Sequence, residues 1–501
     1  MLRRTWTRLY SMNSHVASQF KNQNLLKTEA FVNGKWVSSG KTFAVTDPAK
    51  DTDNELAQVT DMPTDAFESA VEDAYTAFAS FKKVSGRDRG AMLQKLYQLM
   101  IDNADDLAKL IVLENGKPYA DALGEVKYSA SFFQWFAEEA PRVYGTVIPS
   151  ADSQKRILAL KQPVGVCGIM TPWNFPSAMI SRKMGAAMAT GCTVVIRPAS
   201  ETPLSALALA YLAEQAGFPA GTVNVLPSSS ASASGKVLTQ HPKVKKVSFT
   251  GSTRVGKILM EQSSSTLKKL SMELGGNAPF IVFEDADLDA AAQGAMVSKF
   301  RSSGQTCVCA NRLYIHEKVY DEFAKKFVAL VNKTKMGYGL DEGITHGPLI
   351  NQKSMDKVRE HIDDAVKKGA KVLAGGNKLP NLGENFHELT VLGDVTKDMV
   401  ITQDETFGPV CPLIKFSTDE EVIAAANDTD VGLAGYFFSK DVSRLFTVGE
   451  ELNVGMIGVN AGGISEAALP FGGVGEAGFG REGSKYGIDD YTVVKAMVVG
   501  L

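Results

Sequence analysis

The sequence has 501 residues, of which 44% are apolar and 22% are charged, and its formal net charge is −3. This length predicts two to four domains, and the near-neutral charge provides no basic surface for nucleic acid or anionic lipid. No apolar run approaches the roughly 18 residues that cross a bilayer, so neither nucleic acid nor membrane is expected as a partner. The five cysteines are scattered, as is usual in a reducing compartment, and without nearby histidines they predict no metal site.

The N-terminal segment, residues 1–27, differs in composition from the rest of the chain. It contains Arg3, Arg4 and Arg8, and no acidic residue precedes Glu29. This composition is typical of a mitochondrial transit peptide and favours the mitochondrial matrix. The alternative is a disordered tail on a cytoplasmic protein, and a start at Met12 would remove all three arginines.

A largely helical block follows. Phe31 to Val37 predicts a hairpin, because Asn33-Gly34 supplies the two positive-φ residues of a type I′ turn. Apolar residues then recur at helical spacing, and Asn115-Gly116 is a helix end. The helices predicted on this basis cover 65–81, 87–113 and 128–139.

From Pro163 onward, short apolar runs alternate with helical stretches, which predicts parallel strands joined by crossover helices in a Rossmann-like sheet. The Ser/Ala tract at 228–234 predicts a surface loop within this region. A second α/β block is expected from Gly276 to about Gly455. The predicted strands are 164–170, 193–196, 223–226, 247–249, 278–283 and 312–316, and the predicted helices between the first four are 177–189, 204–216 and 255–262.

Two stretches carry residues suited to covalent catalysis. Cys307 follows Gly304-Gln305-Thr306 in a small-residue loop, and Glu273 lies on an apolar segment that runs into paired glycines. A thiol nucleophile with a separate carboxylate base is the minimum set for such chemistry. Taken alone, a lone cysteine is more often a small buried apolar residue. Gly304 and the polar flanks favour the nucleophile instead.

These two stretches, Met272-Glu273-Leu274-Gly275-Gly276 and Gly304-Gln305-Thr306-Cys307, resemble the active-site motifs of the aldehyde dehydrogenase superfamily. The longer form, through Cys309 to Arg312, resembles its succinate-semialdehyde dehydrogenase branch, and the likeness extends from about Phe31 to the C-terminus.

The resemblance implies an α/β fold of three parts. A Rossmann-like cofactor domain would be followed by a second α/β catalytic domain, and a small β ribbon would mediate oligomerisation into a homodimer or homotetramer. The expected boundaries are 28–144 with 163–275 for the cofactor domain, 276–460 for the catalytic domain, and 145–162 with 487–501 for the oligomerisation elements.

The expected cofactor is NADP or NAD. Gly251, Ser252 and Gly256 lie at a strand-to-helix junction, where unpaired N–H groups and the helix dipole favour phosphate. As a bare pattern, glycines at this spacing often only permit close helix–strand packing. It is the resemblance to the pyrophosphate-binding segment of the superfamily that points to these three residues.

Arg197 and Ser200 match the family segment that holds the adenosine ribose, with two departures: lysine is usual at the first position, and NAD-preferring members often carry glutamate at the second. A carboxylate there would accept the ribose 2′-OH and repel a 2′-phosphate. Serine removes that repulsion and arginine adds a planar charged donor group, so we expect NADP to be accepted.

The other cofactor and oxyanion residues are also implied by the resemblance. Asn174, in Thr171-Pro172-Trp173-Asn174, matches the oxyanion motif, where its amide and the Cys307 backbone N–H would stabilise a tetrahedral alkoxide. Trp173 from the same motif, with Glu405 and Phe407, would contact the cofactor. Without the family, Asn174 is an ordinary turn residue and Glu405 a solvated loop acid.

Substrate choice depends on three further matches. Arg182 and Arg301 match the arginines that bind the distal carboxylate in the succinate-semialdehyde branch, and Ser465 matches a third contact. Arginine offers bidentate geometry to a carboxylate. The implied reaction is oxidation of a small aldehyde, succinate semialdehyde, to succinate in 4-aminobutyrate degradation. The alternative for each arginine is a surface ion pair.

Cys309, two residues from the nucleophile, is a candidate for a redox-controlled disulfide with Cys307, the alternative being a packed thiol. Three other functions stay open at this point. The first is a dehydrogenase for another ω-carboxy aldehyde such as glutarate semialdehyde. The second is a non-catalytic scaffold of the same fold, and the third is a thiol hydrolase that uses no cofactor.

Overall fold

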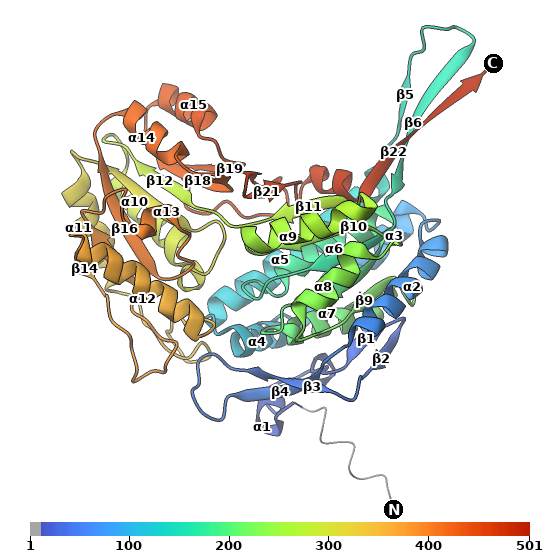
Figure 1. The fold of residues 1–501 in the computed structure, drawn as a ribbon, viewed down its shortest axis with the longest axis horizontal. Helices are drawn as coiled ribbons and strands as arrows, with labels where there is room; N and C mark the ends of the chain where they lie inside the picture. Colours follow the sequence, from blue (N-terminus) through green and yellow to red (C-terminus); the bar gives the residue numbers. More distant parts are fainter. Residues whose placement is uncertain (1–11) are drawn as a thin grey trace, which may run out of the picture.

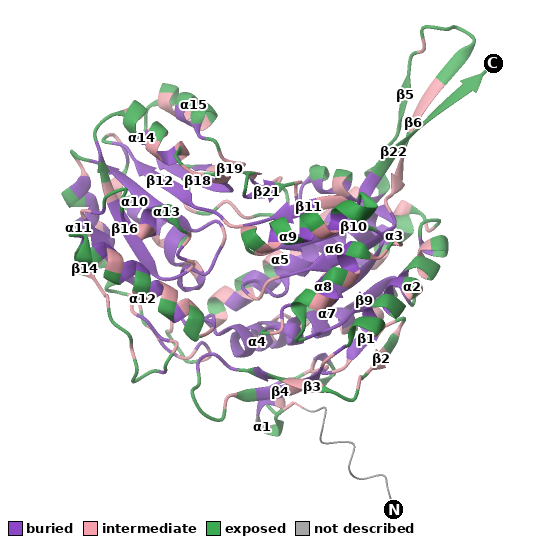
Figure 2. Cartoon of the chain, in the orientation of Figure 1, coloured by how far each residue is buried: buried purple, intermediate pink, exposed green. Residues whose placement is uncertain are grey.

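The computed structural model of the protein describes residues 12–501. Two α/β lobes lie side by side, and a long β ribbon projects from one of them (Figure 1). Buried residues fill the sheets and the inner helix faces of both lobes, whereas the ribbon is mostly exposed (Figure 2). Among the described residues, none of the helices has the length and apolar character needed to cross a membrane.

The first lobe is built on an eight-stranded sheet of order β2-β1-β9-β8-β7-β10-β11-β21. Strands β9, β8, β7, β10 and β11 are parallel, and helices join them as the alternating pattern predicts. The elements of this lobe are α1 (Ser14–Ala17), β1 (Ala30–Val32), β2 (Lys35–Val37), β3 (Thr42–Thr46), β4 (Glu55–Thr60), α2 (Thr64–Phe81), α3 (Gly86–Asp102), α4 (Ala104–Asn115), α5 (Tyr119–Glu139), β7 (Val166–Met170), α6 (Ala178–Thr190), β8 (Thr193–Arg197), α7 (Pro203–Ala216), β9 (Val223–Val225), α8 (Ala231–Gln240), β10 (Val244–Thr250), α9 (Thr253–Ser263), β11 (Lys269–Glu273) and β21 (Gly478–Phe479).

The second lobe contains a seven-stranded sheet of order β14-β15-β16-β13-β12-β18-β19, in which only β14 runs antiparallel to its neighbour among the described strands. Phe280, Phe300 and Phe327 belong to its fully buried core. The elements are β12 (Ala278–Val282), α10 (Leu288–Ala295), β13 (Ala310–His316), α11 (Tyr320–Val331), α12 (Gln352–Lys367), β14 (Lys371–Ala374), β15 (Thr390–Gly393), α13 (Val400–Gln403), β16 (Val410–Phe416), α14 (Asp419–Asn427), β17 (Val431–Gly432), β18 (Ala434–Phe438), α15 (Val442–Glu451), β19 (Met456–Val459) and β20 (Val474–Gly475).

The ribbon joins residues that are far apart in sequence. Strands β5 (Thr146–Ile148) and β6 (Lys155–Pro163) form a hairpin, and β22 (Thr492–Gly500) pairs antiparallel along β6 with Thr492 opposite Pro163. The prediction that 145–162 forms extended ribbon is therefore confirmed. Figure 1 shows the three strands reaching away from both lobes.

The predicted hairpin is confirmed: Asn33 and Gly34 have φ of 50° and 71° between β1 and β2. The single helix predicted over 87–113 is wrong, because α3 ends at Asp102 and α4 begins at Ala104. At the break, Asn103 donates to Leu99 O (2.8 Å) and accepts from the side chain of Asn22 (2.8 Å). A segment distant in sequence therefore stabilises an interruption that the helical spacing does not reveal.

The predicted loop at 228–234 is also partly wrong, since α8 begins at Ala231. In the second lobe, α10 is regular only to Ala295 and continues as a π turn over Met296–Phe300.

Within the N-terminal segment, the arginines at 3, 4 and 8 lie outside the described residues. From Met12 onward the chain lies on the first lobe, where Val16, Phe20 and Leu25 are buried in its core. That part is not a free tail.

Candidate active site

The first sheet presents its functional residues at one edge. Asn174 lies in the loop after β7, Arg197 ends β8, Gly251 follows β10 and Glu273 ends β11. Since these strands are parallel, all four positions are at carboxyl ends. The strand order reverses between β7 and β10, and such a switch point is where open α/β sheets bind ligands.

The second sheet contributes residues from its opposite, amino edge. Cys307 precedes β13, and Glu405 and Phe407 precede β16. The chain passes directly from Glu273 through Gly275-Gly276 into β12. The carboxyl edge of one sheet therefore meets the amino edge of the other, and the cysteine and the glutamate come from different lobes.

A tight turn fixes the loop that carries Cys307. Ser302, Ser303 and Gly304 have φ of 54°, 54° and 78°, three successive left-handed residues. A Cβ on Gly304 would lie 2.2 Å from the carbonyl oxygen of Gly408, so glycine is required there, as the sequence indicates. Ser303 Oγ donates to Gly347 O (2.8 Å) and stabilises the turn.

Asn174 is buried and lies beside this loop. Its side-chain Nδ2 donates to Gln305 O (3.1 Å), and Lys117 Nζ donates to its backbone oxygen (2.7 Å). Lys117 is itself paired with Glu125 (2.6 Å) beneath the site. The structure thus brings Asn174 to the segment just before Cys307 and holds it rigidly through a buried network.

Cys307 is half-buried, and burial raises the pKa of its thiol to about 12, against the charge of Arg182, which lowers it. The thiol is therefore protonated at neutral pH and needs a base to become a nucleophile.

Cys309 is buried and its Sγ donates to Lys299 O (3.4 Å). Both cysteines are free thiols within residues 12–501.

Glu273 is 1% exposed, and neither of its carboxylate oxygens has a hydrogen-bond partner among the described residues. Burial, followed by the negative charge of Glu482, raises the pKa of Glu273 well above its usual value. A buried carboxyl group with a raised pKa is suited to proton transfer near neutral pH.

Sequence reasoning did not single out two charged neighbours of Glu273. Glu482 forms buried ion pairs with Arg182 and Lys183, and Lys183 Nζ also donates to Thr250 Oγ1 (2.5 Å). The sequence signal for Lys183 was its position directly after Arg182. Glu482 lies in the glycine-rich C-terminal stretch. That stretch gave no reason to place it beside α6.

Arg182 is completely buried on α6, and its guanidinium lies 4.3 Å from the ring centroid of Phe471. Apart from the Glu482 pair, its Nη1 and Nη2 atoms have no acceptor in the described part of the chain. Arg301 lies 5.1 Å from the ring centroid of Phe175. The predicted alternative of a surface ion pair is thus wrong for Arg182.

Arg301 and Ser465 line one small cavity, of about 20 Å³, together with Cys309 and Thr306. The structure therefore brings the second arginine, the predicted third contact and the cysteine-bearing loop to a common space.

The predicted cofactor residues are at the switch point and beside it. Arg197 Nη2 donates to Ser228 O (3.0 Å), while its buried Nε has no partner among residues 12–501. Ser200 Oγ contacts Glu201 Oε2 (3.1 Å) at the surface. Ser252 caps α9 by accepting from Val255 N (3.4 Å).

Gly256 supports the packing interpretation of the glycine pattern, because a Cβ there would lie 2.5 Å from Leu274 Cδ2. Glu405 accepts from Gly276 N (3.3 Å), and burial raises its pKa to about 7. Phe407, at φ 53°, packs edge-on against Trp173 with ring centroids 5.7 Å apart. Glu405 and Phe407 lie on one segment before β16, whereas Trp173 follows β7, so the contact of Trp173 with Phe407 joins the two lobes.

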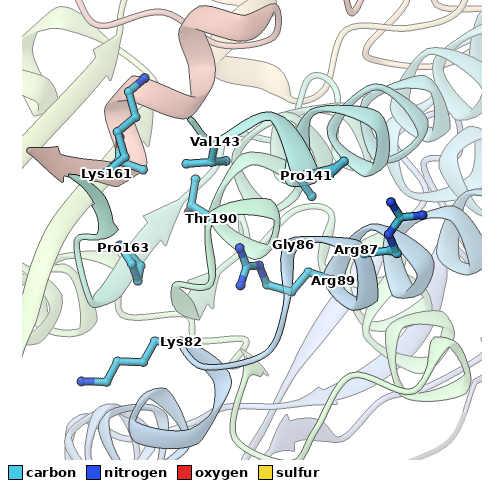
Figure 3. Close-up of a pocket in the computed structure, with 11 residues that line it drawn as sticks. Lys82, Gly86, Arg87, Arg89, Pro141, Val143, Lys161, Pro163 and Thr190 are labelled. Atoms are coloured by element: carbon cyan, nitrogen blue, oxygen red, sulfur yellow. The ribbon is translucent and has the colours of Figure 1, made fainter. Parts of the chain in front are cut away.

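A larger cavity, of about 350 Å³, lies elsewhere, at the foot of the ribbon. In Figure 3, Arg89 extends toward Thr190, whereas Lys82 and Arg87 extend away from it. None of the predicted site residues lines this cavity, so its size does not identify it as the reacting centre.

Comparison with known proteins identifies the arrangement. The Aldehyde dehydrogenase family matches residues 36–497. The chain belongs to the aldehyde dehydrogenase family.

Among individual proteins similar to this aldehyde dehydrogenase, succinate-semialdehyde dehydrogenase [NADP(+)] 1 of Schizosaccharomyces pombe is 55% identical, over 98% of this chain and 99% of the relative. A glutarate-semialdehyde dehydrogenase of Pseudomonas putida is 51% identical, over 96% of this chain and 100% of the relative.

The crystal structure of succinate-semialdehyde dehydrogenase from Burkholderia pseudomallei has a TM-score of 0.94 and 50% identity, covering 96% of this chain and 100% of that one. The predicted family and fold class of this aldehyde dehydrogenase are therefore confirmed, and its expected activity on small aldehydes follows from the family. Within the described residues, no group of three or more His, Cys, Asp or Glu side chains could hold a metal ion.

Proposed function

We propose that this aldehyde dehydrogenase oxidises succinate semialdehyde to succinate with NADP or NAD as the acceptor. The observation that supports this substrate best is Arg182. It is a buried cation with two unpaired nitrogens, close enough to Cys307 for its charge to lower the pKa of the thiol. An aldehyde with a carboxylate at its far end would bring the missing acceptor to that arginine.

Glu273 would take the proton of the Cys307 thiol and pass it to solvent, and the thiolate would add to the aldehyde carbon, forming a tetrahedral alkoxide on the substrate. One N–H of the Asn174 side chain is engaged by Gln305, so its second N–H and the Cys307 backbone N–H are the donors proposed for the developing oxyanion. Because Asn174 is held from below by Lys117, these donors need little reorganisation when charge develops.

The residues present fit a bound dinucleotide. The buried Arg197 Nε lacks an acceptor among residues 12–501, and the start of α9 offers main-chain N–H groups that an anion can accept from. Arg197 and Ser200 would hold the adenosine ribose, and Gly251, Ser252 and Gly256 would border the pyrophosphate. Trp173, Glu405 and Phe407 would hold the nicotinamide end. When bound, the nicotinamide supplies the hydride acceptor.

Glu273 would then act on the thioester that remains on Cys307. As a carboxylate it would take a proton from a water molecule, whose oxygen attacks the thioester carbon and releases the acid and the thiol. Lys183 and Glu482, paired beside it, would set the electrostatic environment of this carboxyl group.

The test is steady-state reduction of NADP and of NAD by the purified protein, with succinate semialdehyde and with butanal as a control that lacks the carboxylate. We expect a strong preference for succinate semialdehyde in kcat/KM. Equal rates with butanal would contradict the substrate and leave the dehydrogenase. Absence of turnover with either cofactor would favour the scaffold, and hydrolysis of a thioester without any dinucleotide would favour the hydrolase.

Glutarate semialdehyde is the second candidate, favoured by the similarity to the Pseudomonas putida protein. One additional methylene would move the carboxylate relative to Arg301 and Ser465 without removing either contact. A comparison of kcat/KM for the two semialdehydes decides between them.

For Cys309 we propose an oxidisable partner of Cys307, because both lie on one short loop that borders the same site. Peroxide should inactivate native protein reversibly through a Cys307–Cys309 disulfide, with thiol restoring activity. If Cys309→Ala is inactivated and rescued to the same extent as the native protein, the disulfide is not the cause.

The ribbon is the proposed oligomerisation element. Val147, Val494 and Val498 are 70%, 70% and 59% exposed on it, an apolar surface that a second copy of the chain would cover. We therefore infer a homodimer or homotetramer, and sedimentation of the native protein beside Val494→Lys tests this.

For location we propose the mitochondrial matrix on the composition of residues 1–27, with the cytoplasm as the alternative. Fluorescent fusions starting at Met1 and at Met12 compare the two.

A further inference from the structure

We propose that the hydroxyl of Tyr128 is a specificity-determining donor that binds the substrate carboxylate together with Arg182 and Arg301. This inference rests on the proposed function, and it adds to that same site a residue that the sequence motifs do not include.

Helix α5 places Tyr128 against the helix that carries Arg182. Its ring packs edge-on against Phe132, with centroids 4.9 Å apart, and contacts the buried cluster of Phe175, Ala178 and Met179. Met179 lies one helical turn before Arg182 on α6, and Phe175 is the ring over which Arg301 lies. The Tyr128 ring is therefore held by Phe175, which contacts Arg301, and by the turn of α6 that precedes Arg182.

The hydroxyl itself is buried and has no hydrogen-bond partner of acceptable geometry among residues 12–501. Burial raises the pKa of Tyr128 and keeps the phenol protonated, whereas the charges of Arg182 and Arg301, and the Arg182 guanidinium as a nearby donor to the phenolic oxygen, lower it. A guanidinium has donors and no lone pair, so neither arginine can accept the phenolic hydrogen.

A buried donor without an acceptor destabilises a protein unless a ligand provides the acceptor. Here such a donor lies beside Arg182, whose Nη1 and Nη2 are also unpaired within the described chain. The Tyr128 hydroxyl and the two Arg182 nitrogens can donate to the two oxygens of a carboxylate. A neutral alkyl end has no acceptor and would leave all three donors unpaired. This is how a polar site rejects the analogue that lacks the matching group.

The test is Tyr128→Phe, which removes only the oxygen. We expect KM for succinate semialdehyde to rise about ten- to a hundredfold, as for loss of a hydrogen bond to a charged group, with kcat at saturation unchanged. The kcat/KM for butanal should not change. Because the lost hydroxyl had no partner, the midpoint of thermal unfolding should not fall, whereas loss of a purely structural hydrogen bond would lower it.

Tyr320→Phe is the matched control. Its hydroxyl, in the second lobe, accepts from Asp394 N (2.9 Å), so this variant should lose stability and keep the native KM. Tyr128→Met, which fills the space with a flexible apolar chain, should reproduce the KM change if the phenylalanine variant folds poorly.

Two results separate this inference from the proposed function. A native enzyme that does not distinguish succinate semialdehyde from butanal overturns the substrate and this inference with it. A selective native enzyme whose Tyr128→Phe variant keeps its KM, or loses kcat/KM equally for both aldehydes, overturns the role of Tyr128 alone.

Discussion

The two ends of the candidate active site differ in which half of a hydrogen bond they lack. At the reacting end, Glu273 offers two buried carboxylate oxygens without donors, beside the protonated thiol of Cys307. At the far end, Arg182 and Tyr128 offer donors without acceptors. The first arrangement suits proton transfer to and from any aldehyde, and the second suits one anionic group. Proton transfer and carboxylate selection therefore depend on different side chains of one site.

The largest effect should come from the thiol. Cys307→Ala removes the atom that forms the covalent intermediate, so kcat should fall about 10⁴-fold or more with every aldehyde. The measurement is steady-state turnover with succinate semialdehyde and butanal, and Cys411→Ala, a buried thiol within the second lobe, is the control. Appreciable residual turnover would place the nucleophile elsewhere.

Glu273→Gln should be next, with a loss of kcat of about 10³-fold for both aldehydes, as for removal of a general base. The raised pKa of Glu273 predicts that the rate of the native enzyme rises with pH as this group loses its proton. The pH–rate profile of Glu273→Gln should lack this rise.

The same group should affect stability. Since its folded-state pKa lies above the unfolded value, it stabilises the fold at acid pH, and this contribution is lost as the pH rises through the folded-state pKa. Urea unfolding across pH should show less of this loss for Glu273→Gln. Identical pH profiles in the two proteins would contradict the assignment.

Arg301→Gln should affect only one substrate class. Loss of a charge-assisted contact predicts about a hundredfold lower kcat/KM for succinate semialdehyde, through a higher KM, and no change for butanal. An equal loss for both aldehydes would mean that Arg301 acts through the Cys307 loop, six residues away, and would remove the separation between the two ends.

The smallest effect should be on the cofactor. Ser200→Glu places a carboxylate where a 2′-phosphate would lie, so the ratio of kcat/KM for NADP over NAD should fall about tenfold or more through charge repulsion. The conservative Ser200→Thr should keep the native ratio. If glutamate leaves the ratio unchanged, Ser200 does not contact the adenosine ribose.

Local patterns were sufficient where the deciding contacts are close in sequence. Asn33-Gly34 forms the predicted turn, Gly116 ends α4 in the left-handed conformation at the predicted helix end, and Gly304 has a positive φ before Cys307. The alternation of apolar runs and helical stretches likewise predicted the parallel sheet, because each strand and crossover helix is encoded by its own periodicity. By itself, then, the sequence determined the α/β fold class and singled out Cys307 and Glu273 as candidates for catalysis.

Tertiary structure decided the features that depend on distant partners. Asn22 docks at the break between α3 and α4, and Glu482 pairs with Lys183 across 299 residues of sequence. Tyr128 reads as an ordinary helical aromatic until α5 packs on α6. Burial removes water from such groups, and only the assembled fold determines which of them find a partner and which remain free for a ligand.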